Sequence, residues 1–285
     1  MKKSYLNTIV ILIAAISACS SMAFGQANSS YPWWLSSSLT NPDTTDAVRY
    51  HAEGDFSFTN MSGNLEGTVY RGKILNFIRK GRVTGHLNYL ADISDITKFA
   101  DNSGDPHSAS KIVTNKQIAE AAIDYDLTKV LFLEGGTVWE RDINSAILNR
   151  YSYYGGLGIN QVFEGKHFLN AVLAAGVADI EYDIPPPYTI DMFDVQKKPA
   201  AYLFFMQSYA WNVTEKISFQ EGLRYYPNLS ETKRYRYAAE LRTNFAVWDF
   251  LSFFIGYDYA YDNDAKNVQA YSTDTKTMIG IKLQY

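Results

Sequence analysis

The stretch that decides the fold is residues 48–59, which read VRYHAEGDFSFT. Its even positions are Val, Tyr, Ala, Gly, Phe and Phe, and its odd positions are Arg, His, Glu, Asp, Ser and Thr. Successive side chains of a β-strand point to opposite faces, so this order places the apolar groups on one face and the polar groups on the other. A helix would mix the two sets on every face, and the stretch is therefore predicted to be a strand.

The same alternation recurs through residues 47–285, where it marks about twelve strands. It is clear in residues 82–92, 234–245, 251–262 and 276–285, and weaker in residues 64–78, 113–126, 129–142, 148–161, 167–182, 199–211 and 216–226. Within 64–78 and 167–182 the alternation leaves open which face is polar. An even number of strands suits an antiparallel barrel whose two ends lie on the same side.

The connections between these strands are an independent test. Every second connection is short, near residues 80–81, 127–128, 163–165, 212–215 and 248–249. The others are mostly longer, near residues 93–112, 143–147, 183–198, 227–232 and 263–270, with a short link at 61–63 as the exception. This order is typical of a transmembrane barrel, which has short periplasmic turns and longer external loops.

Aromatic residues gather near both ends of the predicted strands. Trp211, Trp248, Phe250 and Tyr285 fall near the short turns, and Tyr225, Tyr235, Tyr237, Tyr259, Tyr261 and Tyr271 fall near the longer connections. Aromatic rings with a polar edge prefer the headgroup level of a bilayer, so two belts of this kind are expected in a membrane barrel.

The size of the barrel indicates which face is apolar. A soluble barrel would turn its apolar side chains inward. Side chains can just fill the interior of a barrel of about eight strands. Twelve strands make a wider interior, so the apolar face is expected to meet lipid. In hydrocarbon the sheet must also close, because an unpaired edge is costly. We predict a closed antiparallel transmembrane β-barrel, integral to the bacterial outer membrane and in contact with outer-membrane lipids.

Residues 1–23 are predicted to be a signal peptide that directs the chain to the secretion apparatus. Lys2 and Lys3 precede an apolar run over 6–18 that is too short to span a bilayer. Alternatively, Ile-Ser-Ala-Cys at 16–19 resembles a lipoprotein processing site, at which Cys19 would be lipidated. Residues 24–46 are expected to form an irregular periplasmic lead-in. Cys19 is the only cysteine, so ordinary cleavage excludes disulfides and Cys-ligated metals.

The polar faces of the strands supply candidates for the lining of the lumen. They are Arg49, His51, Glu53, Asp55, His86, Asp124, Glu134, Glu140, Arg150, Arg224, Arg236, Glu240, Arg242, Asp258 and Lys276. Charges that face a narrow lumen are costly unless they are paired or hydrated. They could form a salt-bridged interior that only maintains the shape of the barrel, or line a narrow channel for small polar solutes. Arg234, Arg236 and Arg242 beside Arg224 could make one wall basic and favour anions.

Other kinds of chemistry find little support in the sequence. Acidic residues outnumber basic ones by 30 to 26, so binding to nucleic acid is not expected. No cofactor is implied, and residues 101–105 have calcium-loop oxygens without the full spacing or the closing Glu. An outer-membrane lipid hydrolase is the enzymatic alternative, with His51 and His86 as candidates, but no nucleophile motif accompanies them. No catalytic, cofactor-binding or metal-binding residue is therefore predicted.

Several stretches resemble a bacterial family of salt-stress-induced outer-membrane barrels whose function is undetermined. They include GDFSF at 54–58, YDLT at 125–128, WERD at 139–142 and GGLG at 155–158, and the resemblance covers most of 47–285. It implies a fold and a location, with an envelope or stress-response role as an alternative to the channel, and it supplies no catalytic residues. Ile281, Leu283 and Tyr285 on the apolar side of the final predicted strand resemble the signal that the barrel-assembly machinery recognises.

Overall fold

The structure is a computed structural model that describes residues 47–61, 65–99, 109–184, 187–231, 233–263 and 273–285. The predicted signal peptide, Cys19, the lead-in over 24–46, the 101–105 loop and Tyr271 lie outside these residues. The strands are β1 (Arg49–Met61), β2 (Leu65–Lys80), β3 (Val83–Phe99), β4 (Ala109–Asp126), β5 (Leu131–Asp142), β6 (Ile147–Phe163), β7 (His167–Tyr182), β8 (Ala200–Asn212), β9 (Ile217–Pro227), β10 (Tyr235–Trp248), β11 (Leu251–Asp262) and β12 (Thr273–Gln284).

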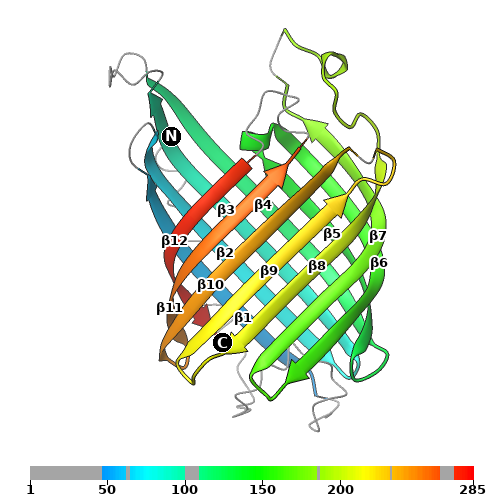
Figure 1. Cartoon of the computed structure of the whole chain (residues 1–285), viewed down its shortest axis with the longest axis vertical. Coiled ribbons are helices and arrows are strands. Elements are labelled where there is room, and N and C mark those ends of the chain that lie inside the picture. Colours follow the sequence, from blue (N-terminus) through cyan, green and yellow to red (C-terminus); the bar gives the residue numbers. More distant parts are fainter. Residues whose placement is uncertain (1–46, 62–64, 100–108, 185–186, 232, 264–272) are drawn as a thin grey trace.

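The twelve strands form one closed antiparallel barrel, as predicted (Figure 1). Each strand pairs with its neighbours in the sequence, and β12 closes the barrel against β1. The register of this closing pair runs from Glu53 opposite Gln284 to Phe58 opposite Ile279. Among the described residues, no helix is long and apolar enough to cross a membrane.

The short connections fall where the sequence predicted them. Gly81 allows the β2–β3 turn because its φ of 56° lies in the left-handed region, which glycine adopts without steric cost. The bounds predicted for the long connection over 93–112 are wrong at both ends, since β3 continues to Phe99 and β4 starts at Ala109. These strand ends are rich in Lys, Asp and Ser and lack the apolar alternation by which the other strands were recognised.

The outer wall of the barrel is apolar, as alternation predicts. On β1, Phe56 is 48% exposed while Asp55 and Ser57 are 8% and 1% exposed. Trp248 and Phe250 stack in the exposed short-turn belt, with ring centroids 5.9 Å apart. Near the longer connections, the rings of Tyr237 and Tyr259 stack at 5.5 Å.

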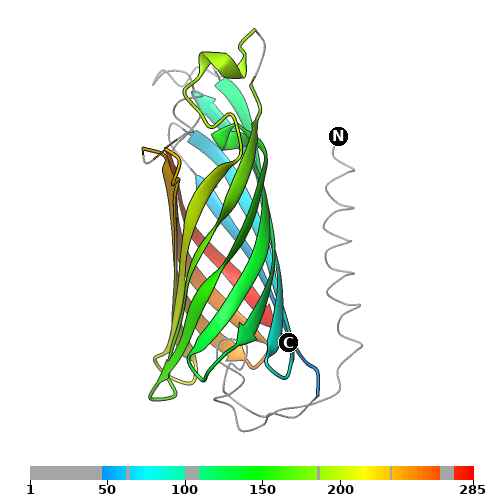
Figure 2. The ribbon, with the colours of Figure 1, turned by 90° about the vertical axis from the view of Figure 1, so that its right-hand side faces the viewer.

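The interior contains an apolar cluster as well as charged groups. Side chains from β5 to β9 form one buried apolar cluster, here called the aromatic cluster: Phe132, Tyr154, Val172, Ala174, Ala178, Ala200, Tyr202, Phe204 and Tyr226. Comparison of Figures 1 and 2 shows that the barrel is flattened, being wide in one view and narrow in the view at 90°. Opposite walls therefore approach one another, and side chains can meet across the lumen.

Glycines make room for the rings of the aromatic cluster, and substituting one of them tests this packing. Gly158 lies opposite Phe132 in the β5–β6 register, and a Cβ at this position would overlap the ring of Phe132. We expect Gly158→Ala to lower the free energy of unfolding by about 1–3 kcal/mol, because Phe132 must leave its packed position. Urea unfolding in lipid vesicles, followed by tryptophan fluorescence, measures this change.

The matched control is Gly135→Ala on the outer face. A Cβ at Gly135 would lie 3.8 Å from the nearest atom, the backbone oxygen of Tyr154, which is an ordinary contact. Equal losses of stability in the two variants would contradict the packing described here.

Candidate functional site: the charged interior

The fifteen residues predicted from the sequence to line the lumen all stand at interior positions of their strands. Most are buried, and the structure pairs them with charged residues that sequence reasoning missed: Arg71, Lys73, Asp92, Lys116, Glu120, Asp142, Asp262 and Lys282. Arg71 and Lys73 were missed because both faces of β2 are mixed in polarity. Lys73 lies opposite Asp55 in the register, so cross-strand charge matching against β1 could have identified it.

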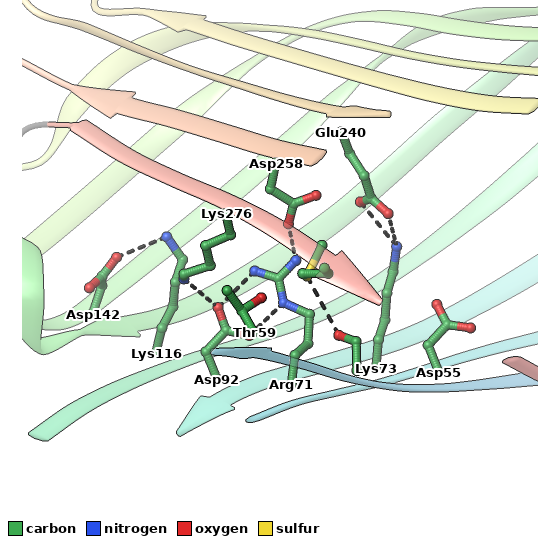
Figure 3. Close-up of polar contacts among 12 residues, drawn as sticks. Asp55, Thr59, Arg71, Lys73, Asp92, Lys116, Asp142, Glu240, Asp258 and Lys276 are labelled. Atoms are coloured by element: carbon green, nitrogen blue, oxygen red, sulfur yellow. Dashed lines mark hydrogen bonds and ion pairs between the residues drawn. The ribbon is translucent and has the colours of Figure 1, made fainter. Parts of the chain in front are cut away.

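The first group of ion pairs is centred on Asp92, whose residue is only 1% exposed (Figure 3). Arg71 forms a bidentate pair with it, with Nε–Oδ1 and Nη2–Oδ2 distances of 2.5 Å and 2.7 Å. Lys276 Nζ lies 2.8 Å from Asp92 Oδ2, and Arg71 also bonds to Asp258 across the barrel. This group fastens β2 and β3 to β11 and β12.

A second group joins β10 to β1 and β2. Lys73 Nζ lies 3.3 Å from both carboxylate oxygens of Glu240 (Figure 3). Arg242 Nε lies 2.5 Å from Glu240 Oε1, and its Nη1 bonds to Asp55. The guanidinium also lies over the ring of Phe254, 4.5 Å from the centroid. On β1 and β12, Glu53 accepts Lys282 at 2.7 Å and lies 3.1 Å from His51 Nε2.

A third group crosses the lumen between β5–β6 and β10–β11. Glu140 Oε2 accepts Arg150 Nη1 at 2.9 Å and Arg236 Nη1 at 2.5 Å, and Arg150 Nη2 binds Asp262 at 2.6 Å. Beside them, Lys116 Nζ lies 2.8 Å from Asp142 Oδ2. We call these residues the constriction cluster: Lys116, Glu140, Asp142, Arg150, Arg236 and Asp262. It has three cations and three carboxylates, so its charges balance.

A fourth group, the carboxylate cluster, consists of Glu120, Asp124 and Glu134 with His86 and Tyr154. His86 Nε2 lies 2.5 Å from Asp124 Oδ2. The hydroxyl of Tyr154 lies 2.9 Å from Glu134 Oε1 and 3.2 Å from Glu120 Oε1. Across the barrel, Arg224 Nη2 lies 3.4 Å from Glu120 Oε2.

Two cavities lie inside the barrel. The larger, of about 390 Å³, is lined by parts of the first, second and fourth groups. The smaller, of about 100 Å³, is lined by the constriction cluster. Lys116 and Arg224 line both cavities and therefore mark the point where they approach each other. Among the described residues, no group of three or more His, Cys, Asp or Glu side chains could hold a metal ion.

The basic wall that the sequence suggested is neutralised by carboxylates in the structure. Arg224, Arg236 and Arg242 each face a carboxylate on another strand. Arg234 lies just before β10, outside the strands, and binds Glu231 at 2.7 Å and Asp194 at 2.9 Å. The interior therefore does not present an unopposed row of guanidinium groups.

The connection between β7 and β8 is fastened to the segment that precedes β10. Asp194 Oδ2 accepts Lys233 Nζ at 2.6 Å, and this hydrogen bond holds the pKa of Asp194 below its ordinary value. Beside it, Gln196 is buried, donating to the backbone oxygen of Ala178 at 2.7 Å and accepting the Tyr202 hydroxyl at 2.6 Å. The connection thus contacts one end of the aromatic cluster.

Comparison with known proteins gives a family without a stated activity. The family model described as "Protein of unknown function, DUF481" matches residues 54–285. No curated protein matches the chain. The salt-stress association expected from the resemblance stays a prediction.

Solved structures with a similar barrel include the KdgM porin, at 11% identity and a TM-score of 0.44, covering 82% of this chain and 99% of that chain. The NanC porin has 10% identity and a TM-score of 0.47, with the same coverage of both chains. The COG4313 outer membrane channel from Pseudomonas putida F1 has 10% identity and a TM-score of 0.45, covering 86% of this chain and 99% of that chain.

The burial of the first group predicts a large effect on stability. Asp92→Ala leaves Arg71 and Lys276 without their shared buried partner, and we expect the free energy of unfolding to fall by about 3 kcal/mol. The control is Asp191→Ala, which removes an exposed pair with Lys197 at 3.4 Å and should cost less than about 1 kcal/mol. Urea unfolding in lipid vesicles compares the two, and similar losses would contradict the assignment of Asp92 to a buried network.

The contact of Asp194 predicts a response to acid. Because the folded-state pKa is depressed, the contact is stabilising above the unfolded pKa of about 4 and is lost as the pH falls through the lower folded value. We expect the protection of amides in residues 187–199, measured as exchange relative to the intrinsic rate at each pH, to fall over that range. In Asp194→Asn this protection should be low at neutral pH already, with no further step on acidification. A wild-type segment whose protection is the same above and below that range would refute this link.

Proposed function

The chain belongs to the DUF481 family, whose function is unknown, and we propose that it is an integral barrel of the bacterial outer membrane with a narrow channel for small polar solutes. The observation that carries the proposal is a cavity of about 390 Å³, lined in part by charges, inside a closed barrel with an apolar outer wall.

The outer wall supports the membrane location. Leu157 and Ile255 on opposite sides of the barrel are 54% and 52% exposed, and such residues recur on every side. A contiguous apolar surface of this kind is costly in water but matches the hydrocarbon of a bilayer. The closed ladder leaves no sheet edge, which hydrocarbon would not tolerate.

Export and assembly belong to the same proposal. The secretion apparatus would recognise residues 1–23, with lipidation of Cys19 as the alternative route. The barrel-assembly machinery would recognise the outward row of Ile281, Leu283 and Tyr285, of which Leu283 and Tyr285 are exposed. The short turns would face the periplasm and the longer connections would face outward.

The constriction cluster would set the size limit of the channel. Its ion pairs join opposite walls, so a solute must pass beside them or displace them. Balanced charge at this level favours small polar solutes over bulky ones and does not by itself select anions. We propose no enzymatic activity, since His51 and His86 both contact carboxylates in this interior and no nucleophile motif accompanies them.

A second candidate is a structural or stress-related envelope protein with a closed interior. The aromatic cluster favours it, because these side chains fill the lumen beside β5 to β9. The two candidates differ in one measurable property, which is the passage of ions through the folded barrel.

Single-channel recording in planar bilayers tests the channel. We expect small, discrete conductance steps from the wild-type barrel, and larger steps from the double variant Glu140→Ala with Arg236→Ala. This variant removes a matched pair across the lumen, while Arg150 keeps Asp262 and Lys116 keeps Asp142, so no cation is stranded.

The matched control is Asp191→Ala with Lys197→Ala, an exposed pair outside the barrel interior, which should leave the conductance unchanged. A heat-dependent gel shift establishes that each variant is folded. Folded barrels that stay electrically silent in every variant would overturn the channel and favour the closed envelope protein.

A further inference from the structure

The carboxylate cluster differs from the other ion-pair groups in its charge balance. Eight other carboxylates of the described interior have an Arg or Lys partner: Glu53, Asp55, Asp92, Glu140, Asp142, Glu240, Asp258 and Asp262. In the cluster, Arg224 reaches only Glu120. Asp124 is paired with a histidine and Glu134 with a tyrosine hydroxyl.

The register of β4 and β5 brings two of these carboxylates close together. Asp124 on β4 lies directly opposite Glu134 on β5, and both side chains point into the barrel. Like charges at directly opposite positions of an antiparallel pair repel each other. With Glu120, the cluster has three carboxyl groups against one arginine, Arg224, and one histidine, His86.

One buried carboxylate oxygen of the cluster has no hydrogen-bond partner among the described residues. The same holds for one oxygen each of Asp55 and Asp258, but the other oxygen of those two residues binds an arginine. Asp124 is 7% exposed, and its Oδ1 is buried with no hydrogen-bond partner in the described structure. Leaving a charged oxygen unsatisfied in a buried position is costly. Asp124 and Glu134 both line the cavity of about 390 Å³, so a positively charged group in that cavity could reach them.

The other walls of the cavity indicate the kind of cation. Phe77 lines the cavity with its ring 5.1 Å from that of His86, and Leu75, Leu90 and Ile118 add apolar surface. The donor set argues against a metal, because no group of three potential ligands among the described residues is close enough to hold one. A protonated primary amine has three N–H donors on a compact charge, and its carbon chain would pack against the apolar wall.

We propose that the carboxylate cluster binds the ammonium group of a small organic amine, with Asp124 and Glu134 as its acceptors. This inference rests on the proposed function and names the class of solute that the channel would admit. Arg242 and Lys73 line the same cavity on another wall, so the ammonium group would be oriented toward β4 and β5.

Isothermal titration of the detergent-solubilised full-length protein tests binding without relying on conduction. The probe is butylammonium chloride at neutral pH, with 1-butanol as the uncharged comparison. We expect saturable binding of butylammonium and none of butanol. Glu134→Gln and Asp124→Asn should each weaken the binding of butylammonium about tenfold, the usual loss when one charge-assisted hydrogen bond is removed.

Folding and total charge are controlled separately. The amide oxygen that Glu134→Gln introduces can still accept from Tyr154, and the variant removes a repulsion, so its thermal midpoint should not fall. Asp249→Asn removes the same charge at an exposed turn and should leave the affinity for butylammonium unchanged.

The outcomes separate this inference from the channel. Binding that depends on Asp124 and Glu134 in an electrically silent barrel would support the amine site and overturn only the channel. A conducting barrel that shows no butylammonium binding, or whose two cluster variants bind it as tightly as the wild type does, would overturn the amine site alone. Equal weakening in Asp249→Asn would also overturn it, because the effect would then reflect total charge.

Discussion

The structure depends on one constraint: in a closed sheet that faces lipid, as we propose for this barrel, successive side chains must alternate between hydrocarbon and the interior. Each charged residue between two apolar ones is then forced inward. Charges that face a narrow lumen are costly unless they are paired or hydrated, and most of these charges are paired with one another. Flattening of the barrel shortens the distance between opposite walls, and pairs such as Arg71 with Asp258 become possible between strands that are not neighbours.

The interior solves the problem of filling a twelve-strand barrel in two ways. Around β5 to β9, aromatic rings occupy the space, with Gly158 opposite Phe132 where a larger residue would not fit. Elsewhere in the interior, including other levels of β5, β6 and β9, long Arg and Lys side chains end on carboxylates, and some of them span the lumen. The first way is rigid packing, and the second leaves polar cavities between its ion pairs.

The fold could be predicted from the sequence because alternation is a local property. The predicted site was less complete, because interior pairing depends on contacts between distant strands. Asp258 could be placed inside from β11 alone, but its partner Arg71 lies on β2, where polarity did not distinguish the faces. The aromatic cluster was missed for a similar reason, since β7 and β8 have apolar residues on both faces. At 93–112, strand ends without apolar alternation were mistaken for a loop.

The closing pair of strands has a consequence for biogenesis. Its ladder, from Glu53–Gln284 to Phe58–Ile279, is much shorter than that of β3 and β4, which runs from Val83–Tyr125 to Phe99–Ala109. Because the barrel closes between β1 and β12, the strand synthesised first among the twelve can pair only after the last one, more than two hundred residues later, has been made. Long-range pairing of this kind slows folding. Among the described residues this seam has the shortest ladder of paired residues, so it is where we expect two strands of the barrel to separate most easily.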